Sequence, residues 1–186
     1  MAKYVLASGS PRRKQLLEWA EIDFEIIVEL TDETYPENLS NEDAVIHIAG
    51  NKIKAVLNKV KKNSIIIAAD SVVVLNGEFI GKPKDQQHAF GILHKLSGQH
   101  HQVITGVVIQ STNKKVSFTD TTDVEFYHLT NEQIKFYVDK YKPYDKAGAY
   151  AIQEWIGVVG IKRIAGDFYN VMGLPISRVV QALKDF

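Results

Sequence analysis

Residues 64–75 read Ser-Ile-Ile-Ile-Ala-Ala-Asp-Ser-Val-Val-Val-Leu, which is a nearly continuous apolar run. Runs of this kind are typical of strands that are covered on both faces of a sheet. Asn76-Gly77 follows as a strong hairpin-turn signal, and the chain returns through residues 78–80. The stretch therefore predicts a doubly covered strand with an antiparallel return beside it.

The segments around this run carry alternating strand and helix patterns. We predict strands over residues 3–7, 24–28, 64–75, 78–80, 101–109 and 116–128, and extended chain over 148–152 and 158–164. We predict helices over residues 11–19, 40–61, 85–96, 130–141 and 175–186, with a loop over 166–175 that enters the last helix. The strand–helix–strand order at the start and the hairpin in the centre favour a mixed α/β sheet.

Length and composition favour one globular unit. The chain has 186 residues, of which 45% are hydrophobic, so it can build one sizeable core. We therefore expect a single domain over residues 1–186, with two lobes at most. No 18-residue apolar span is present, and the N-terminus runs directly into a strand pattern, so we expect a cytoplasmic protein with no membrane partner.

Charge and cysteine content narrow the classes of partner. Lys and Arg number 22, as do Asp and Glu, so the formal net charge is zero. A general polyanion-binding surface needs an excess of positive charge, and long nucleic acid is therefore not an expected partner. The absence of cysteine excludes disulfides and thiolate chemistry, and a zinc site would need histidine and carboxylate ligands alone.

Residues 8–13, Ser-Gly-Ser-Pro-Arg-Arg, join the first predicted strand to the first predicted helix. Ser10 suits the N-cap, and Pro11 suits the first helical position. Backbone N–H groups and the positive dipole end of the helix favour an anion there, and arginine forks match phosphate oxygens. Because two first-turn arginines are unfavourable unless an anion joins them, the turn predicts phosphate binding. An ordinary cap with solvated arginines is the alternative.

Asp70 interrupts the apolar run, where an unpaired carboxylate would be costly to bury, so it needs a partner. One interpretation is a structural ion pair between a strand-end Asp and a lysine. The other is a functional carboxylate at the carboxyl end of a strand, where open α/β sheets place ligands, with the Ser71 hydroxyl beside it. Lys82 follows the hairpin in Gly81-Lys82-Pro83, so the return can bring it beside Asp70, although a plain turn explains the flanking Gly and Pro equally well.

Lys52 lies on or beside the apolar stripe of the helix predicted over 40–61. A lysine there is more often a snorkelling stem than a ligand. Together with the two arginines and Lys82, however, Lys52 would make a cationic pocket for a triphosphate.

Glu33 lies in an acidic loop, residues 29–37, where carboxylates are usually only solvated. Magnesium uses one or two protein carboxylates with substrate phosphate oxygens and waters, so Glu33 and Asp70 would suffice as a sparse site. The six histidines form no HExxH or comparable pair, and we expect His100 and His101 to be partly exposed at a strand end.

Residues 145–153 form a segment of small side chains that ends in Gln153. Gly148 and the alanines permit close approach, and the Gln153 amide can both donate and accept hydrogen bonds, as reading a base edge requires. Core packing by small residues explains the first half of the segment equally well.

Six segments match, in order, the motifs of a known family. They are Ser8-Gly9-Ser10-Pro11-Arg12-Arg13, Ala69-Asp70-Ser71-Val72-Val73, Gly81-Lys82-Pro83, Thr105-Gly106-Val107, Ala147-Gly148-Ala149-Tyr150-Ala151-Ile152-Gln153 and Asn170-Val171-Met172-Gly173-Leu174-Pro175. From residue 6 to residue 178, the chain resembles the Maf family of nucleotide pyrophosphatases, also called septum formation inhibitor proteins. Six ordered motifs are far more specific than any one of them.

The resemblance implies an elongated mixed α/β sheet flanked by helices, with a central cleft between two lobes, similar to the inosine triphosphate pyrophosphatases and frequently a homodimer. It implies hydrolysis of a nucleoside triphosphate to monophosphate and pyrophosphate, assisted by a divalent metal such as Mg²⁺ or Mn²⁺. By position in the motifs, Asp70 is the catalytic base, and Glu33 is its metal partner. The residues that match the phosphate-binding set are Ser8, Arg12, Arg13, Lys52 and Lys82.

Within the family, the branch that acts on dTTP and UTP resembles this chain through Arg12, Ser71 and Gln153. The branch that acts on 7-methyl-GTP usually carries Glu at the Gln153 position. Ser71 departs from the more usual threonine but keeps the hydroxyl. The resemblance therefore implies a dTTP/UTP pyrophosphatase that controls normal nucleotide pools or performs housecleaning of modified pyrimidine nucleotides. The older family name suggests a second hypothesis, a nucleotide-sensing regulatory protein of cell division and septum formation.

Overall fold

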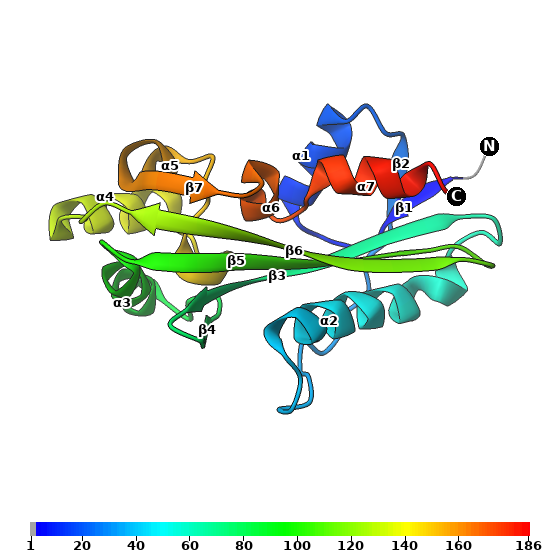
Figure 1. Cartoon of the computed structure of the whole chain (residues 1–186), viewed down its shortest axis with the longest axis horizontal. Helices are drawn as coiled ribbons and strands as arrows, with labels where there is room; N and C mark the ends of the chain where they lie inside the picture. The colour runs from blue at the N-terminus through cyan, green and yellow to red at the C-terminus, as the bar shows by residue number, and fades with distance from the viewer. Residues whose placement is uncertain (1–2) are drawn as a thin grey trace. The chain divides into compact units, whose positions relative to one another are not determined.

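The computed structural model describes residues 3–186 (Figure 1). The strands are β1 (Tyr4–Leu6), β2 (Phe24–Ile26), β3 (Ile65–Leu75), β4 (Glu78–Ile80), β5 (His100–Gln110), β6 (Lys115–Phe126) and β7 (Ile161–Ala165). The helices are α1 (Pro11–Trp19), α2 (Asn41–Val56), α3 (Gln86–Leu96), α4 (Asn131–Tyr141), α5 (Trp155–Gly160), α6 (Phe168–Met172) and α7 (Ile176–Leu183). Two 3₁₀ turns, η1 (Leu57–Lys59) and η2 (Ala147–Ala149), complete the regular structure of the described part.

The strands of residues 3–186 form one sheet in the order β2-β1-β3-β5-β6-β7, with β4 paired to β3. The pairs β1–β2 and β1–β3 are parallel, whereas β3–β4 and β6–β7 are antiparallel. Asn76 and Gly77 turn the β3–β4 hairpin with φ angles of 52° and 82°, as the Asn-Gly signal predicts. The predicted mixed α/β sheet flanked by helices is confirmed.

The described chain divides into two compact units. Unit 1 comprises residues 3–71, 105–120 and 173–186, and unit 2 comprises residues 72–104 and 121–172. Strands β3, β5 and β6 each contribute residues to both units. The expected cleft between two lobes of a single domain stays a prediction.

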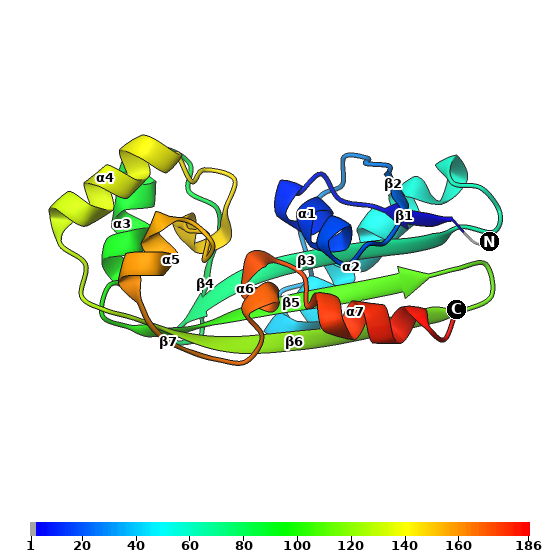
Figure 2. The ribbon, with the colours of Figure 1, turned by 90° about the horizontal axis from the view of Figure 1, so that it is seen from above.

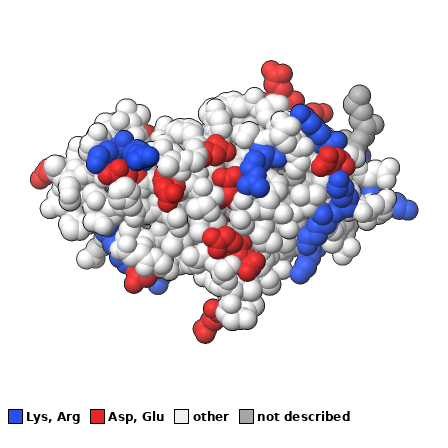
Figure 3. All heavy atoms as spheres, in the orientation of Figure 1, with Lys and Arg blue, Asp and Glu red and all other residues white. Residues whose placement is uncertain are grey.

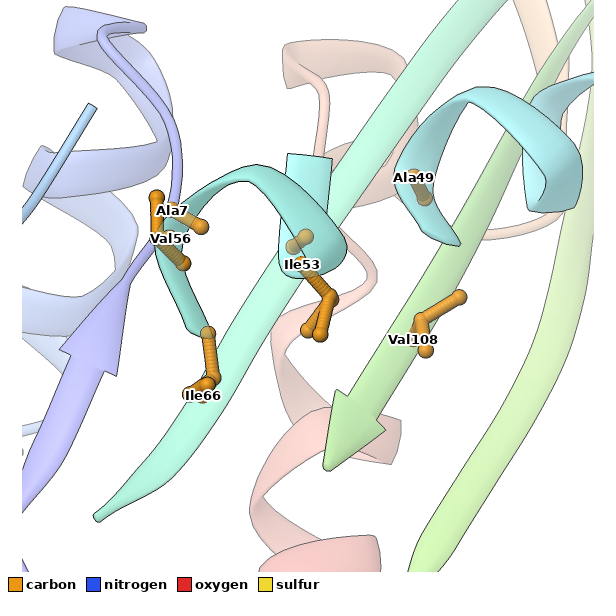
Figure 4. Packing of buried hydrophobic residues seen from close by; sticks show 7 residues of the cluster. Ala7, Ala49, Ile53, Val56, Ile66 and Val108 are labelled. Carbon is orange, nitrogen blue, oxygen red and sulfur yellow. The ribbon is translucent and has the colours of Figure 1, made fainter. Parts of the chain in front are cut away.

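In unit 1, α2 lies on one face of the strands, and α1 and α7 lie on the other (Figures 1 and 2). Helix α2 packs through Ala49, Ile53 and Val56, which recur at helical spacing and therefore share one face. Figure 4 shows these side chains directed toward Ile66 of β3 and Val108 of β5 within one buried cluster. This packing fixes α2 against the strand that carries Asp70.

In unit 2, helix α4 lies next to α3 (Figure 2), and its Phe136 ring packs edge-on against Trp155 of α5. Helix α4 begins with a complete capping box between Thr130 and Gln133, which confirms the predicted N-terminus. Its buried residues are Ile134, Tyr137 and Val138, so a tyrosine stands on the apolar face of this helix.

Two predicted segments are wrong, and a third, 158–164, is extended only from residue 161 onward. The stretch 148–152 is not a strand, because Gly148 takes a φ of +69° and turns the chain through η2. Val158–Gly160 ends helix α5, and the strand begins only at Ile161; Val158 is 81% exposed, so its β-branched side chain is not packed in a sheet. The expected loop before the last helix contains helix α6. Helix α2 also ends earlier than predicted, at Val56, and continues as η1.

Basic and acidic side chains are interspersed on the face that Figure 3 shows, in keeping with the balanced charge. In residues 3–186, no helix is both long enough and apolar enough to cross a membrane.

Candidate functional site

The turn between β1 and α1 has the predicted geometry. Ser10 is the N-cap, its hydroxyl accepts a 3.5 Å hydrogen bond from the Arg13 N–H, and Pro11 follows at the first helical position. The Ser8 hydroxyl is buried and accepts from the Ser10 N–H at 3.3 Å. Backbone amides and serine hydroxyls therefore converge at the N-terminus of α1, an arrangement that suits an anion.

The Arg13 side chain is buried and connects three parts of unit 1. Its Nε donates to the Gly173 carbonyl at 2.8 Å, one Nη donates to Ser8 Oγ at 3.1 Å, and the other donates to Ser71 Oγ at 3.0 Å. These bonds engage three of its five N–H donors. Burial lowers the pKa of Arg13, and the nearby Asp70 carboxylate opposes that shift. Arg13 therefore has a structural role in addition to the predicted phosphate contact.

Arg12 differs from Arg13 in burial, because its side chain is half-buried in the first turn of α1. The positive charge of Arg12 lowers the pKa of Arg13 further, after the larger effect of burial. The expected clustering of two guanidinium groups is thus present, with only one of them built into the interior.

Ser71 joins β3 to β5 through its hydroxyl. Besides the bond from Arg13, its Oγ lies 2.8 Å from Thr105 Oγ1. Thr105 is fully buried, and although it begins the family-like motif Thr105-Gly106-Val107, no site role was predicted for it. It interrupts the apolar run Val103–Val108 in the same way that Asp70 interrupts its own strand, and that interruption is the signal that could have identified it.

Asp70 has the partner that the sequence requires. Lys52 Nζ lies 2.6 Å from Asp70 Oδ1 and 3.3 Å from Glu33 Oε1. The Lys52 and Asp70 side chains are only 14% and 13% exposed, whereas Glu33 is 48% exposed. One ammonium group therefore joins the two carboxylates that were predicted to hold a metal, and Lys52 is directed inward as its place on the helical stripe predicts.

The position of Asp70 within its strand differs from the expectation. β3 continues to Leu75, so Asp70 is not at the strand's carboxyl end. The parallel partner β1, however, stops earlier, and the last registered pair is Leu6 with Ile67. Asp70 consequently stands just beyond the carboxyl end of β1, on the side where the Ser8–Arg13 turn begins. Asp70 therefore still lies at the carboxyl end of a strand, that of β1, which is where open α/β sheets place ligands.

In unit 2, Lys82 follows β4 and Gln153 follows η2, and both residues are exposed. The two segments are connected, because the Gly148 N–H donates to the Gly81 carbonyl at 3.2 Å. Gly148 is required there: its φ is +69°, and an added Cβ would lie 2.8 Å from Val73 Cγ2. The expected proximity of Lys82 to Asp70 stays a prediction.

Tyr137 of α4 holds the segment that carries Gln153. Its buried hydroxyl accepts from the Ala151 N–H at 3.1 Å and donates to Glu154 Oε2. Sequence reasoning missed Tyr137, although a tyrosine on the apolar face of a helix signals a buried hydroxyl that needs a partner.

His101 is not partly exposed as expected, since only 2% of it is accessible. Its Nε2 lies 2.7 Å from the Tyr150 hydroxyl, and its ring packs edge-on against Phe126. Burial lowers the pKa of His101 to about 4 and raises that of Tyr150. His100 is exposed as expected, with its side chain 72% accessible. Within residues 3–186, no group of three or more His, Cys, Asp or Glu side chains is placed to hold a metal ion.

Comparisons with known proteins support the architecture. The sequence matches the family described as "Maf-like protein" over residues 3–186. A dTTP/UTP pyrophosphatase of Parabacteroides distasonis is 45% identical over 185 residues, with 99% of this chain and 96% of the relative covered. A dTTP/UTP pyrophosphatase of Cytophaga hutchinsonii is 49% identical over 181 residues, with 97% and 82% covered. The solved structure of the Staphylococcus aureus Ham1 protein aligns with a TM-score of 0.51 and 20% identity over 98% of both chains, which shows a shared fold.

Proposed function

The chain belongs to the Maf-like protein family, and we propose that it is a nucleoside triphosphate pyrophosphatase that hydrolyses dTTP and UTP to the monophosphate and pyrophosphate. Relatives that are 43–49% identical over nearly the whole chain carry the name dTTP/UTP pyrophosphatase. The observation that carries the proposal is the ion pair between buried Asp70 and half-buried Lys52, beside the Ser8–Arg13 turn. That arrangement sets a carboxylate next to positive charge and next to a helix N-terminus, which is a place that favours anions.

Asp70 is the base in this proposal. It accepts a proton from a water molecule whose oxygen attacks the α-phosphorus. The new oxygen–phosphorus bond forms as the bond to the bridging oxygen breaks, and pyrophosphate leaves. Lys52 orients Asp70 Oδ1 through the 2.6 Å ion pair, which limits the motion of the base.

Charge stabilisation is the larger task, because phosphoryl-type transition states gain chiefly from positioned cations. We assign Ser8, Arg12, Arg13, Lys52 and Lys82 to the phosphates, with Ser71 fastening the Arg13 guanidinium through its 3.0 Å bond. We assign Gln153 to the nucleobase of the substrate.

Glu33 and Asp70 are the residues that would hold a divalent metal, Mg²⁺ or Mn²⁺. Both carboxylates contact one cation, Lys52, so this part of unit 1 already favours positive charge. Hard oxygen donors in this number fit magnesium, which retains substrate and water ligands, and such an ion would neutralise phosphate oxygens. We further propose that the enzyme is cytoplasmic and acts as a homodimer.

The decisive experiment measures pyrophosphate release from dTTP, UTP, CTP and 7-methyl-GTP with Mg²⁺ or Mn²⁺ present. We expect multiple turnover with dTTP and UTP, and a loss of about 10²–10⁴-fold in the Asp70→Asn variant, the usual contribution of a general base. Asp123→Asn, on exposed chain in β6, is the matched control and should retain activity. Stoichiometric nucleotide binding without turnover would instead favour the sensor hypothesis.

A further inference from the structure

We propose that Tyr137 is a positioning residue for base selection, because its hydroxyl fixes the segment on which Gln153 is mounted. The proposal rests on the proposed function, in which Gln153 contacts the base. It adds a residue of α4 that lies outside all six family-like motifs of the sequence.

The Tyr137 hydroxyl bonds to the chain on both sides of Gln153. It accepts from the Ala151 N–H, two residues before Gln153, and it donates to the Glu154 carboxylate, one residue after it. Tyr137 is fully buried, whereas Gln153 is exposed. A buried hydroxyl thus bonds to the chain on both sides of Gln153, which is the exposed residue of the otherwise buried or half-buried stretch 151–154.

Two further contacts hold the same segment. The Lys146 side chain is buried, and its Nζ lies 3.6 Å from Glu154 Oε1. An ion pair therefore joins the start and the end of the segment. The Gly148 N–H bonds to the Gly81 carbonyl, next to Lys82. The Tyr137 hydroxyl is therefore the buried member of a set of contacts that hold the segment 146–154, in which Gln153 is exposed.

Base chemistry explains why this support matters. Uracil and thymine present the O4 acceptor where cytosine presents an N4 amino donor. A primary amide carries a donor and an acceptor, and rotating it by half a turn exchanges them. A freely rotating Gln153 would accept both kinds of base. Rotation of the terminal amide does not move the backbone, so a fixed backbone contributes to discrimination by setting where the amide stands relative to the edge of the nucleobase. A wrong nucleobase at that place leaves polar groups unpaired.

The test is the ratio of kcat/KM for UTP to that for CTP. Tyr137→Phe keeps the ring and removes the hydroxyl. We expect it to lower this ratio by about tenfold, the effect of losing one hydrogen bond between Gln153 and the nucleobase, chiefly through the KM for UTP. Tyr141→Phe is the matched control, because its ring stacks on Tyr137 at 4.9 Å and it loses the same atom. Its ratio should stay at the wild-type value.

A double-mutant cycle separates positioning from general weakening. In a Gln153→Ala background, Tyr137→Phe should change the ratio no further, because the amide that it positions is gone. An equal loss in both backgrounds, or an unchanged ratio in Tyr137→Phe alone, would overturn the proposal.

A second pair of variants covers the case in which Tyr137→Phe does not fold. Glu154→Gln keeps an acceptor for the Tyr137 hydroxyl, whereas Glu154→Ala removes it, and both remove the charge that faces Lys146. We expect the ratio to fall only in Glu154→Ala. Equal ratios in these two variants would contradict the proposal.

Calorimetric binding of α,β-imido-UTP and α,β-imido-CTP gives the same comparison without turnover. A wild-type protein that discriminates in binding but releases no pyrophosphate would contradict the proposed function alone. A wild-type protein that turns over UTP selectively, with selectivity unchanged in Tyr137→Phe, would contradict only the role of Tyr137.

Discussion

Lys52 Nζ lies 2.6 Å from Asp70 Oδ1, and both side chains are largely withdrawn from solvent. The pair joins a helix residue to a strand residue, and it exists because α2 packs Ile53 and Val56 against the strand that carries Asp70. A buried ion pair is weak support for stability as a whole, but removing one partner leaves an uncompensated charge. Loss of the ion pair should therefore affect both the stability of unit 1 and its proposed catalytic activity.

Lys52→Met should lower the free energy of unfolding by about 3 kcal/mol, because it leaves the Asp70 carboxylate buried without its cation. It should also reduce pyrophosphate release by at least about 100-fold, as expected when a charged group in the site is lost. Urea denaturation and steady-state assays measure the two effects. Lys54→Met, on the exposed side of the same helix, should change stability by less than about 0.5 kcal/mol. A Lys52→Met variant that matches wild type in both assays would refute this role.

Arg13→Lys should lower turnover of every substrate by a similar factor and should destabilise the fold by about 2–3 kcal/mol, the usual cost of leaving buried polar groups without partners. A single ammonium group cannot reach Gly173, Ser8 and Ser71 with the geometry of the guanidinium fork, so buried acceptors lose their donors. Thermal melts and substrate panels provide the measurement.

Arg12→Ala is the contrasting variant, because Arg12 is only half-buried. We expect a change of less than about 0.5 kcal/mol in stability. Its preference between dTTP, UTP and CTP should shift along with activity. Identical behaviour of the Arg12 and Arg13 variants would show that burial does not separate their roles.

Gly106→Ala should destabilise the protein by about 1–3 kcal/mol, the usual range for overpacking. An added Cβ would lie 2.7 Å from the Ile46 nitrogen and 2.7 Å from the Val45 carbonyl carbon, so the backbone of α2 would have to move. Because α2 carries Lys52, activity should fall as well. Gly50→Ala tests the same helix without a clash, since no atom other than the adjacent backbone of its own helix lies within 4 Å of the added Cβ. It should stabilise the protein by about 0.5–1 kcal/mol.

Stability should depend on pH through His101, whose pKa burial lowers from 6.5 to about 4. Between these values the unfolded chain binds a proton that the folded chain does not. Stability is therefore complete above pH 6.5 and falls as the pH drops toward 4, by about 3 kcal/mol at most. Denaturation curves at pH 4.5 and pH 7.5 should show a smaller difference in His101→Gln than in wild type. His100→Gln, at an exposed position, should keep the wild-type slope; equal slopes in all three proteins would exclude His101 as the cause.

Local chemistry explains which elements the sequence could predict. The Ser10 cap, the Pro11 start and the Asn76-Gly77 turn depend on residues adjacent in the chain, and all three appear as expected. The prediction for residues 147–160 was wrong because the conformation of this segment does not depend on adjacent residues alone. Its small and β-branched residues resemble strands, but the positive φ of Gly148 and the packing around α5 decide its shape.

The candidate site divides in the same way. That Asp70 required a partner follows from its place in an apolar run, whatever the fold. That the partner is Lys52, and that Glu33 shares it, required α2 to be placed on β3. His101 at the start of a strand looked exposed, because nothing nearby in sequence announces the Phe126 and Tyr150 rings that cover it.

By itself, the sequence determined the class of sheet, the helix starts and hairpin, the need for a charged partner at Asp70 and the family to which the chain belongs. Periodicity, capping and the burial cost of a carboxylate depend on residues that are close together in the chain, so they can be predicted from the sequence. Only the tertiary structure decided that Arg13 is built into the interior, that Thr105 bonds Ser71 and that Tyr137 supports the Gln153 segment. Each of these contacts joins residues at least 14 positions apart, and the packing of helices on strands, rather than local propensity, brings such residues together.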